Sequence, residues 1–244
     1  MPLTLNCDLG ESFGSWKMGM DEAVMPHIHQ ANIACGFHAG DAVIMRRTLA
    51  LAKAHGVSVG AHPAYPDLQG FGRRSMLCSH DEIVAYLHYQ MSALEGMANN
   101  VGLSLDYVKP HGALYNDMMA KADVRAAVMQ AVAEHHSKPA LMLQAVPEND
   151  EHIKEAAALG LSLKFEAFAD RCYDDDGKLL SRSKPGAVHT QEKMMAQVRQ
   201  LCDEGTVTTV SGNTLPLHAD TLCVHGDNDA GIQAIAQIRA LVDA

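Results

Sequence analysis

The sequence predicts an α/β fold, a closed TIM-like barrel of seven βα units. Short apolar runs alternate with longer amphipathic stretches along the chain, as expected for parallel strands joined by helical crossovers. All but one of the apolar runs end in a cluster of charged or imidazole side chains. In a barrel the loops after all the strands share one active site, whereas a doubly wound sheet places its site at one switch point. The dispersed clusters therefore favour the barrel.

The predicted strands are short apolar runs, as is typical of buried parallel strands. In chain order they cover residues 3–5, 33–35, 57–59, 105–108, 139–143, 163–165 and 222–224. The fifth run is the exception, because it continues into uncharged residues.

The predicted helices lie between these runs. Asp41 is a candidate N-cap for the helix that follows the second run, and Gly56 is a candidate residue for its end. Ser79 and Glu82 have the spacing of a capping box at the start of the next helix. Apolar residues at helical spacing predict further helices at 117–135, 148–159, 190–202 and 227–242.

Two segments depart from the alternation. Residues 65–78 contain Gly70, Gly72, Arg73 and Arg74, and residues 173–188 contain an Asp-Asp-Asp-Gly sequence typical of a hairpin turn. Both are long enough to fold over a site entrance, so we expect them to be lid loops. No linker or low-complexity tract divides the chain, and residues 1–244 are expected to form a single (β/α)7 barrel domain.

Composition narrows the class of partner. The formal net charge is −10, without long blocks of like charge, which argues against nucleic acid and anionic membranes and favours a small molecule or another protein. There is no secretory signal pattern, and no apolar stretch approaches the ~20 residues that span a bilayer. The six cysteines form no C-x-x-C pair, which fits a reducing compartment. A cytoplasmic location is expected.

Five motifs carry a family resemblance. They are NCDLGE at 6–11, ANIACGFHAGD at 31–41, GAHP at 60–63, KPHGALYN at 109–116 and EAFADR at 166–171. Together they resemble the LamB/YcsF family over most of the chain, from Leu5 to Asp227. One departure is minor: Ala64 and Tyr65 stand where family members often have a small residue and then Ser or Phe.

The resemblance implies both a fold and a reaction. The implied fold is similar to the (β/α)7 barrel of glycoside hydrolases and polysaccharide deacetylases. The implied activity is that of a bacterial 5-oxoprolinase, in which the lactam 5-oxoproline (pyroglutamate) is opened to L-glutamate with hydrolysis of ATP. The resemblance also implies separate B and C subunits as partners.

Lactam opening needs a base for water, donors for the oxyanion and an acid for the departing ring nitrogen. Our hypothesis is that Asp8 or His62 activates the water, while Lys109 and Arg171 stabilise the developing negative charge. An ion pair between Asp170 and Arg171 is the structural alternative for Arg171. The full set of candidate catalytic residues is Asp8, Glu11, His38, His62, Lys109, His111, Glu166, Arg171 and His225.

Two alternatives stay open at this point. Asp8, His62 and His111 could form the carboxylate and imidazole set with which a barrel deacetylase holds a divalent ion. The chain would then be a metal-dependent deacetylase or amidohydrolase, and a substrate-binding subunit without its own chemistry is the third possibility. No phosphate-binding loop motif is present, so the sequence does not locate ATP or the Mg²⁺ expected with it.

Overall fold

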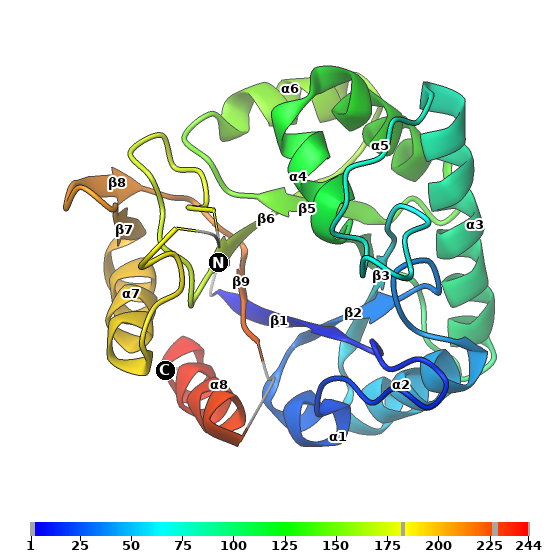
Figure 1. Ribbon diagram of the computed structural model, residues 1–244, viewed down its shortest axis with the longest axis horizontal. Helices are drawn as coiled ribbons and strands as arrows, with labels where there is room; N and C mark the ends of the chain where they lie inside the picture. Colours follow the sequence, from blue (N-terminus) through cyan, green and yellow to red (C-terminus); the bar gives the residue numbers. More distant parts are fainter. Residues whose placement is uncertain (1–2, 182–183, 226–228, 244) are drawn as a thin grey trace.

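The computed structural model describes residues 3–181, 184–225 and 229–243. Its centre is a closed barrel of parallel strands in the order β1-β2-β3-β4-β5-β6-β9, and Figure 1 looks into this barrel. The barrel strands are β1 (Thr4–Leu9), β2 (Gln30–Ala34), β3 (Ser58–His62), β4 (Tyr107–Val108), β5 (Ala140–Gln144), β6 (Leu163–Phe168) and β9 (Thr221–Cys223). The predicted α/β barrel with seven parallel strands is confirmed.

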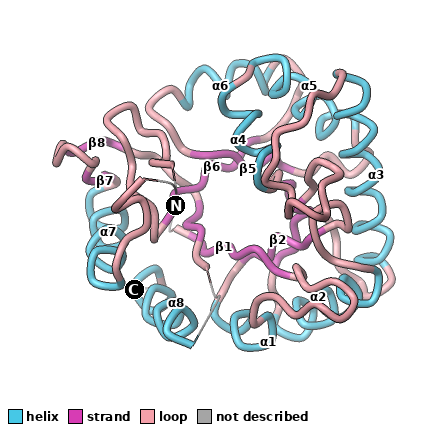
Figure 2. The backbone as a smooth tube through the Cα atoms, viewed as in Figure 1, coloured by secondary structure: helices cyan, strands magenta, loops and turns pink. Residues whose placement is uncertain are grey.

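Helices form a ring outside the strands (Figure 2). They are α1 (Asp21–Val24), the 3-10 turn η1 (Met25–His27), α2 (Ala42–His55), α3 (His80–Asn99), α4 (Gly112–Ala120), α5 (Ala122–Glu134), α6 (Asn149–Ala157), α7 (Gln191–Glu204) and α8 (Asp229–Val242). An antiparallel pair, β7 (Thr206–Thr208) and β8 (Thr214–Pro216), stands apart from the barrel and was not predicted. No helix in the described ranges is long and apolar enough to cross a membrane.

Local capping sets the helix boundaries where the sequence placed them. The Asp41 carboxylate accepts hydrogen bonds from the backbone N–H groups of Val43 and Ile44, and α2 ends at Gly56 with φ +66°. The capping box of Ser79 and Glu82 is formed at the start of α3. These predicted boundaries are confirmed.

The helix predicted over 117–135 is wrong in its extent. The structure has two helices there, because Lys121 adopts an extended conformation (φ −125°, ψ +118°) between α4 and α5. The first of them begins earlier than predicted, at Gly112, directly after His111. This early start brings the first turns of α4 next to the strand ends. The predicted helix start at Asp227 lies outside the described residues.

The strands run further than the apolar stretches suggested, and polar residues lie inside them. Successive side chains of a strand point to opposite faces. In β1, Leu5, Cys7 and Leu9 belong to the apolar core, whereas the alternate residues Asn6 and Asp8 point into the barrel, where both contact Lys109. Parallel register places Asp8 beside Asn32 of β2. The barrel interior therefore carries a polar layer within an apolar shell.

Candidate active site

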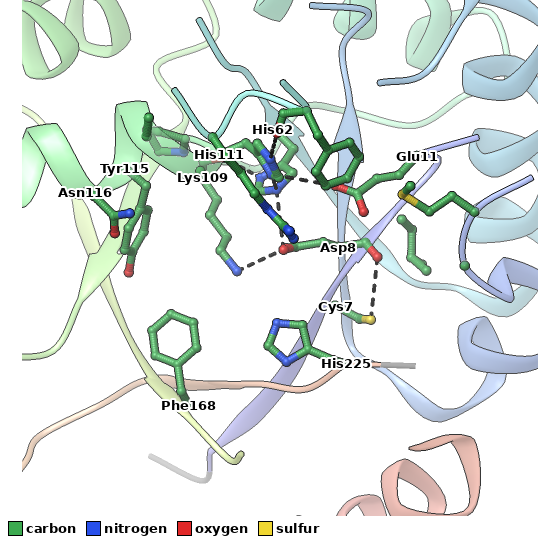
Figure 3. Close-up of a pocket in the computed structure, with 18 of the residues that line it drawn as sticks. Cys7, Asp8, Glu11, His62, Lys109, His111, Tyr115, Asn116, Phe168 and His225 are labelled. Carbon is green, nitrogen blue, oxygen red and sulfur yellow. Dashed lines mark hydrogen bonds and ion pairs between the residues drawn. The ribbon is translucent and has the colours of Figure 1, made fainter. Parts of the chain in front are cut away.

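A cavity of about 1010 Å³ opens at the carboxyl ends of the barrel strands. Figure 3 shows its charged and imidazole side chains gathered from separate strands. Seven of the nine predicted site residues line it: Asp8, Glu11, His62, Lys109, His111, Arg171 and His225. The other two, His38 and Glu166, are buried behind this lining and contact it through Glu11 and Lys109.

Lys109 is the central cation of the cavity floor. It is 3% exposed, and its Nζ lies 3.1 Å from Asp8 Oδ1 and 3.0 Å from Glu166 Oε2. It also donates to Asn6 Oδ1 at 3.2 Å and to Cys223 Sγ at 3.3 Å. Burial alone would lower the pKa of Lys109, but the charges of Asp8 and Glu166 raise it well above its ordinary value. The ammonium is therefore charged at neutral pH.

Asp8 uses its two oxygens for different partners. Oδ1 accepts from Lys109 and, at 2.7 Å, from the Asn32 side chain, while Oδ2 lies 3.4 Å from His62 Nε2. Burial would raise the pKa of Asp8, but His62 and Lys109 together lower it well below its ordinary value. Asp8 is thus a fixed negative charge, which is a weak base.

Two imidazoles face each other at the centre of the site. His62 Nδ1 lies 2.7 Å from the Lys109 carbonyl oxygen, and His111 Nε2 lies 2.9 Å from the Phe71 carbonyl oxygen. The remaining nitrogens, His62 Nε2 and His111 Nδ1, are 2.9 Å apart. Burial and the neighbouring rings of His38 and His62 lower the pKa of His111 to about 2, so its ring is neutral.

Glu11 and His38 border the same two rings. His38 stacks on His111 with ring centroids 3.7 Å apart, and its Nε2 lies 3.2 Å from Glu11 Oε1. The same oxygen lies 3.6 Å from His111 Nδ1. Burial and the charge of Asp8 raise the pKa of Glu11 above its ordinary value, which favours its protonated form relative to that of an exposed carboxyl.

Loop 65–78 packs directly on these imidazoles. Its Phe71 supplies the carbonyl that fixes His111, and Gly72 has φ +64° with the His111 and His38 side chains close by. A Cβ at Gly72 would lie 2.8 Å from each of them. Inside the loop, the buried carboxylate of Asp67 accepts from the Gly70 N–H and pairs with Arg74.

Arg171 and His225 lie on the opposite side of the cavity. Arg171 donates to the carbonyl oxygens of Leu180 and Ala187, so it binds the loop at 173–188. Within that loop the predicted turn is formed, since the Gly177 N–H donates to the Asp174 carbonyl oxygen. Asp170 lies 3.0 Å from His225 Nδ1.

Sequence reasoning missed several lining or supporting groups. Asn32 orients Asp8 and accepts a 2.6 Å hydrogen bond from the Tyr107 hydroxyl, while Arg73 and Phe168 line the cavity. Asn32 lies within the second motif and Phe168 within the fifth. Period-two alternation along each strand would have indicated which polar residues face inward.

The donor set fits a divalent ion. Glu11, His38, His62 and His111 offer ligand atoms that all lie within 4.8 Å of one another. Two members of the predicted metal set, His62 and His111, are in this group, and Asp8 lies beside it. Imidazole nitrogen and carboxylate oxygen are ordinary ligands of zinc and similar metals.

Known proteins resemble the chain along its whole length. It is 54% identical to a Pseudomonas putida protein named as A subunit 2 of 5-oxoprolinase, covering 99% of this chain and 94% of that protein. It is 52% identical to the 5-oxoprolinase A subunit of Chromohalobacter salexigens, covering 100% and 97%. The solved structure of a lactam utilization protein from Thermus thermophilus superposes with a TM-score of 0.91 at 37% identity, covering 100% and 98%.

The sequence profile of a single protein family extends over nearly all of the barrel, from β1 to α8. It matches residues 3–244 and includes all five motifs and every residue of the cavity floor. This chain therefore belongs to the LamB/YcsF family.

Proposed function

We propose that this chain is the A subunit of a 5-oxoprolinase, which opens 5-oxoproline to L-glutamate with hydrolysis of ATP and works with separate B and C subunits. The relatives named as A subunits of 5-oxoprolinase support the substrate, and the word subunit supports an assembly. The observation that carries the proposal is the buried ammonium of Lys109, held at the floor of a cavity beside a carboxylate and two imidazoles.

In this arrangement Asp8 lies between His62 and Lys109. On the side of Asp8 Oδ2, His62 would face the water that attacks the lactam carbonyl. Because Asp8 is held ionised, the His62 imidazole is the better of the two as a proton acceptor, and Asp8 aligns it. On the side of Asp8 Oδ1, Lys109 offers a positive charge to the oxygen that becomes negative. Glu11, with its raised pKa, is the acid that protonates the ring nitrogen.

The cavity has basic side chains that suit anionic reactants. Lys17 and Arg73 line it in addition to Lys109 and Arg171, although the protein as a whole is acidic. The carboxylate of 5-oxoproline and the phosphates of ATP are both anions. A volume of about 1010 Å³ lies at the upper end of the range for small-molecule sites, which supports room for a second reactant. We propose that ATP reaches this cavity with its Mg²⁺.

We also propose that residues 65–78 and 173–188 act as lids of a single barrel domain over 1–244, and that the protein works in the cytoplasm. Phe71 and Arg73 of the first loop and Leu179 and Ser181 of the second line the cavity. The two loops thus approach the site from opposite sides. Six free thiols support a reducing location.

Reconstitution tests the proposed function. Glutamate release from 5-oxoproline is measured with the purified chain alone and with B and C subunits, each with and without ATP. We expect turnover only with all subunits and ATP, and a loss of about 10²–10³-fold in kcat for Lys109→Met, the effect of removing one oxyanion donor. Lys53→Met, at an exposed position on α2, is the control and keeps wild-type turnover. Amide hydrolysis by the isolated chain with divalent metal and no ATP would instead identify a metal-dependent amidohydrolase.

A further inference from the structure

The facing nitrogens of His62 and His111 need an occupant between them. A carbonyl oxygen can only accept a hydrogen bond, so His62 carries its hydrogen on Nδ1 and His111 carries its hydrogen on Nε2. In their neutral forms the two rings direct lone pairs toward each other across 2.9 Å. Two lone pairs at this distance repel unless a cation or a proton lies between them.

The surrounding oxygens indicate which occupant fits. Asp8 Oδ2 lies 3.4 Å from His62 Nε2, and Glu11 Oε1 lies 3.6 Å from His111 Nδ1. Ligand atoms about 2.1 Å from one ion are about 3.0 Å apart at right angles and about 3.4 Å apart at the tetrahedral angle. The separations of 2.9 Å between the two rings and 3.6 Å between Glu11 and His111 suit ligands of one ion, and the ligand atoms of Glu11, His62 and His111 all lie within 4.8 Å of one another. We propose that Glu11, His62 and His111 bind one divalent transition-metal ion, with Asp8 beside it.

Charge at the cavity floor supports a divalent cation. Asp8, Glu11 and Glu166 are three carboxyl groups, and Lys109 is shared between Asp8 and Glu166. An ion with two positive charges would offset the remaining excess. The mixture of nitrogen and oxygen ligands favours zinc, manganese or cobalt over magnesium, which prefers oxygen alone.

The ligands and the neighbouring Asp8 also have the outer partners that metal ligands usually have. Backbone carbonyls hold both imidazoles in the tautomer that frees the facing nitrogen. Asn32 and Lys109 hold Oδ1 of Asp8, which leaves Oδ2 directed at His62. His38 Nε2 lies 3.2 Å from Glu11 Oε1, the oxygen that also faces His111.

This inference deepens the proposed function because it concerns the same cavity, but it does not require 5-oxoproline as the substrate. When bound, such an ion supplies positive charge that makes a nearby water more acidic. His62 and Glu11 would then serve as ligands in place of acting as base and acid, and Asp8 would lie beside the ion. Metal content tests the proposed ion, and turnover of 5-oxoproline tests the proposed function. Because the two are measured separately, failure of one proposal is distinguishable from failure of the other.

The test is metal binding by the full chain. The protein is stripped with a chelator, titrated with Zn²⁺, Mn²⁺ or Co²⁺ by calorimetry, dialysed and analysed for metal. We expect one equivalent per chain, and X-ray absorption of the cobalt form with two imidazole nitrogens among its ligands. Absence of binding, or a ligand shell of oxygen alone, overturns the proposal and leaves a shared proton as the occupant of the pair.

Variants locate the ion within the chain. His111→Gln and Glu11→Gln are expected to lose the equivalent, and His38→Gln to weaken binding by about 10–100-fold, as for loss of an outer partner. His136→Gln is the matched control, because Glu95 of α3 and His135 and His136 after α5 form a second candidate cluster. The proposal is overturned if the bound metal ion is lost in His136→Gln and kept in His111→Gln. Unfolding curves establish that each variant is folded. The X-ray absorption spectrum of the wild-type protein tests the ligands even if a variant does not fold.

Discussion

Replacing Lys109 with Met tests whether one buried ammonium holds two carboxylates together. Met keeps a long unbranched side chain, but Asp8 and Glu166 lose a cation that lies 3.1 and 3.0 Å from them. Breaking a buried ion pair by removing one partner costs about 3–5 kcal/mol. Because Asn32 still donates to Asp8, we expect the lower end, a loss of about 3 kcal/mol in the free energy of unfolding.

Urea denaturation followed by circular dichroism at pH 7 measures this loss. The double variant Lys109→Met with Glu166→Gln removes a carboxylate together with its partner, so it should be more stable than the sum of the two single losses implies. Lys53→Met, on the exposed face of α2, should change stability by less than about 0.5 kcal/mol. A loss below about 1 kcal/mol for Lys109→Met, or strict additivity in the double variant, would refute the reasoning.

Three further predictions concern the surroundings of the site. Gly72→Ala should lower the free energy of unfolding by about 1–3 kcal/mol, because φ is +64° and Cβ would meet two imidazoles; denaturation curves check this, with Gly96→Ala, which has open space, as the control. Asp41→Ala should cost about 1 kcal/mol through loss of the α2 cap, measured in the same way. Burial lowers the pKa of His225, but Asp170 outweighs this and raises it above 6.5. The resulting stabilisation is complete below the unfolded pKa and is lost as pH rises through the folded value, so Asp170→Asn should destabilise more at pH 5.5 than at pH 9; an equal loss at both would contradict it.

The barrel was predictable because its signal is repetitive. Apolar runs and capping residues such as Asp41 and Ser79 are local, and each one fixes an element boundary independently of the others. The division between α4 and α5 was not predictable in this way. Lys121 has ordinary helix propensity, and its extended backbone is set by tertiary packing, which overrides propensity.

A general rule for barrels located the site residues in the sequence. The same rule did not predict the hydrogen bonds and burial that relate these residues to one another. Strand ends converge in any such barrel, so the expectation that Asp8, His62 and Lys109 would meet followed from topology. The tautomers of His62 and His111 depend on two backbone carbonyls that lie far away in the sequence. Burial of Glu166 behind Lys109 likewise depends on packing across the barrel. The catalytic roles stay predictions until the variants are measured.

The hydrogen bond from His111 to Phe71 links the position of loop 65–78 to the tautomer of His111. While loop 65–78 is seated, the His111 hydrogen is confined to Nε2, the nitrogen that faces the Phe71 carbonyl oxygen. If the loop lifted beyond hydrogen-bond distance, that hydrogen would be free to move to the other nitrogen, and the lone pair facing His62 would be lost. The position of loop 65–78 would then decide which His111 nitrogen carries the hydrogen. The His111 lone pair would face His62 only while the loop covers the entrance of the site.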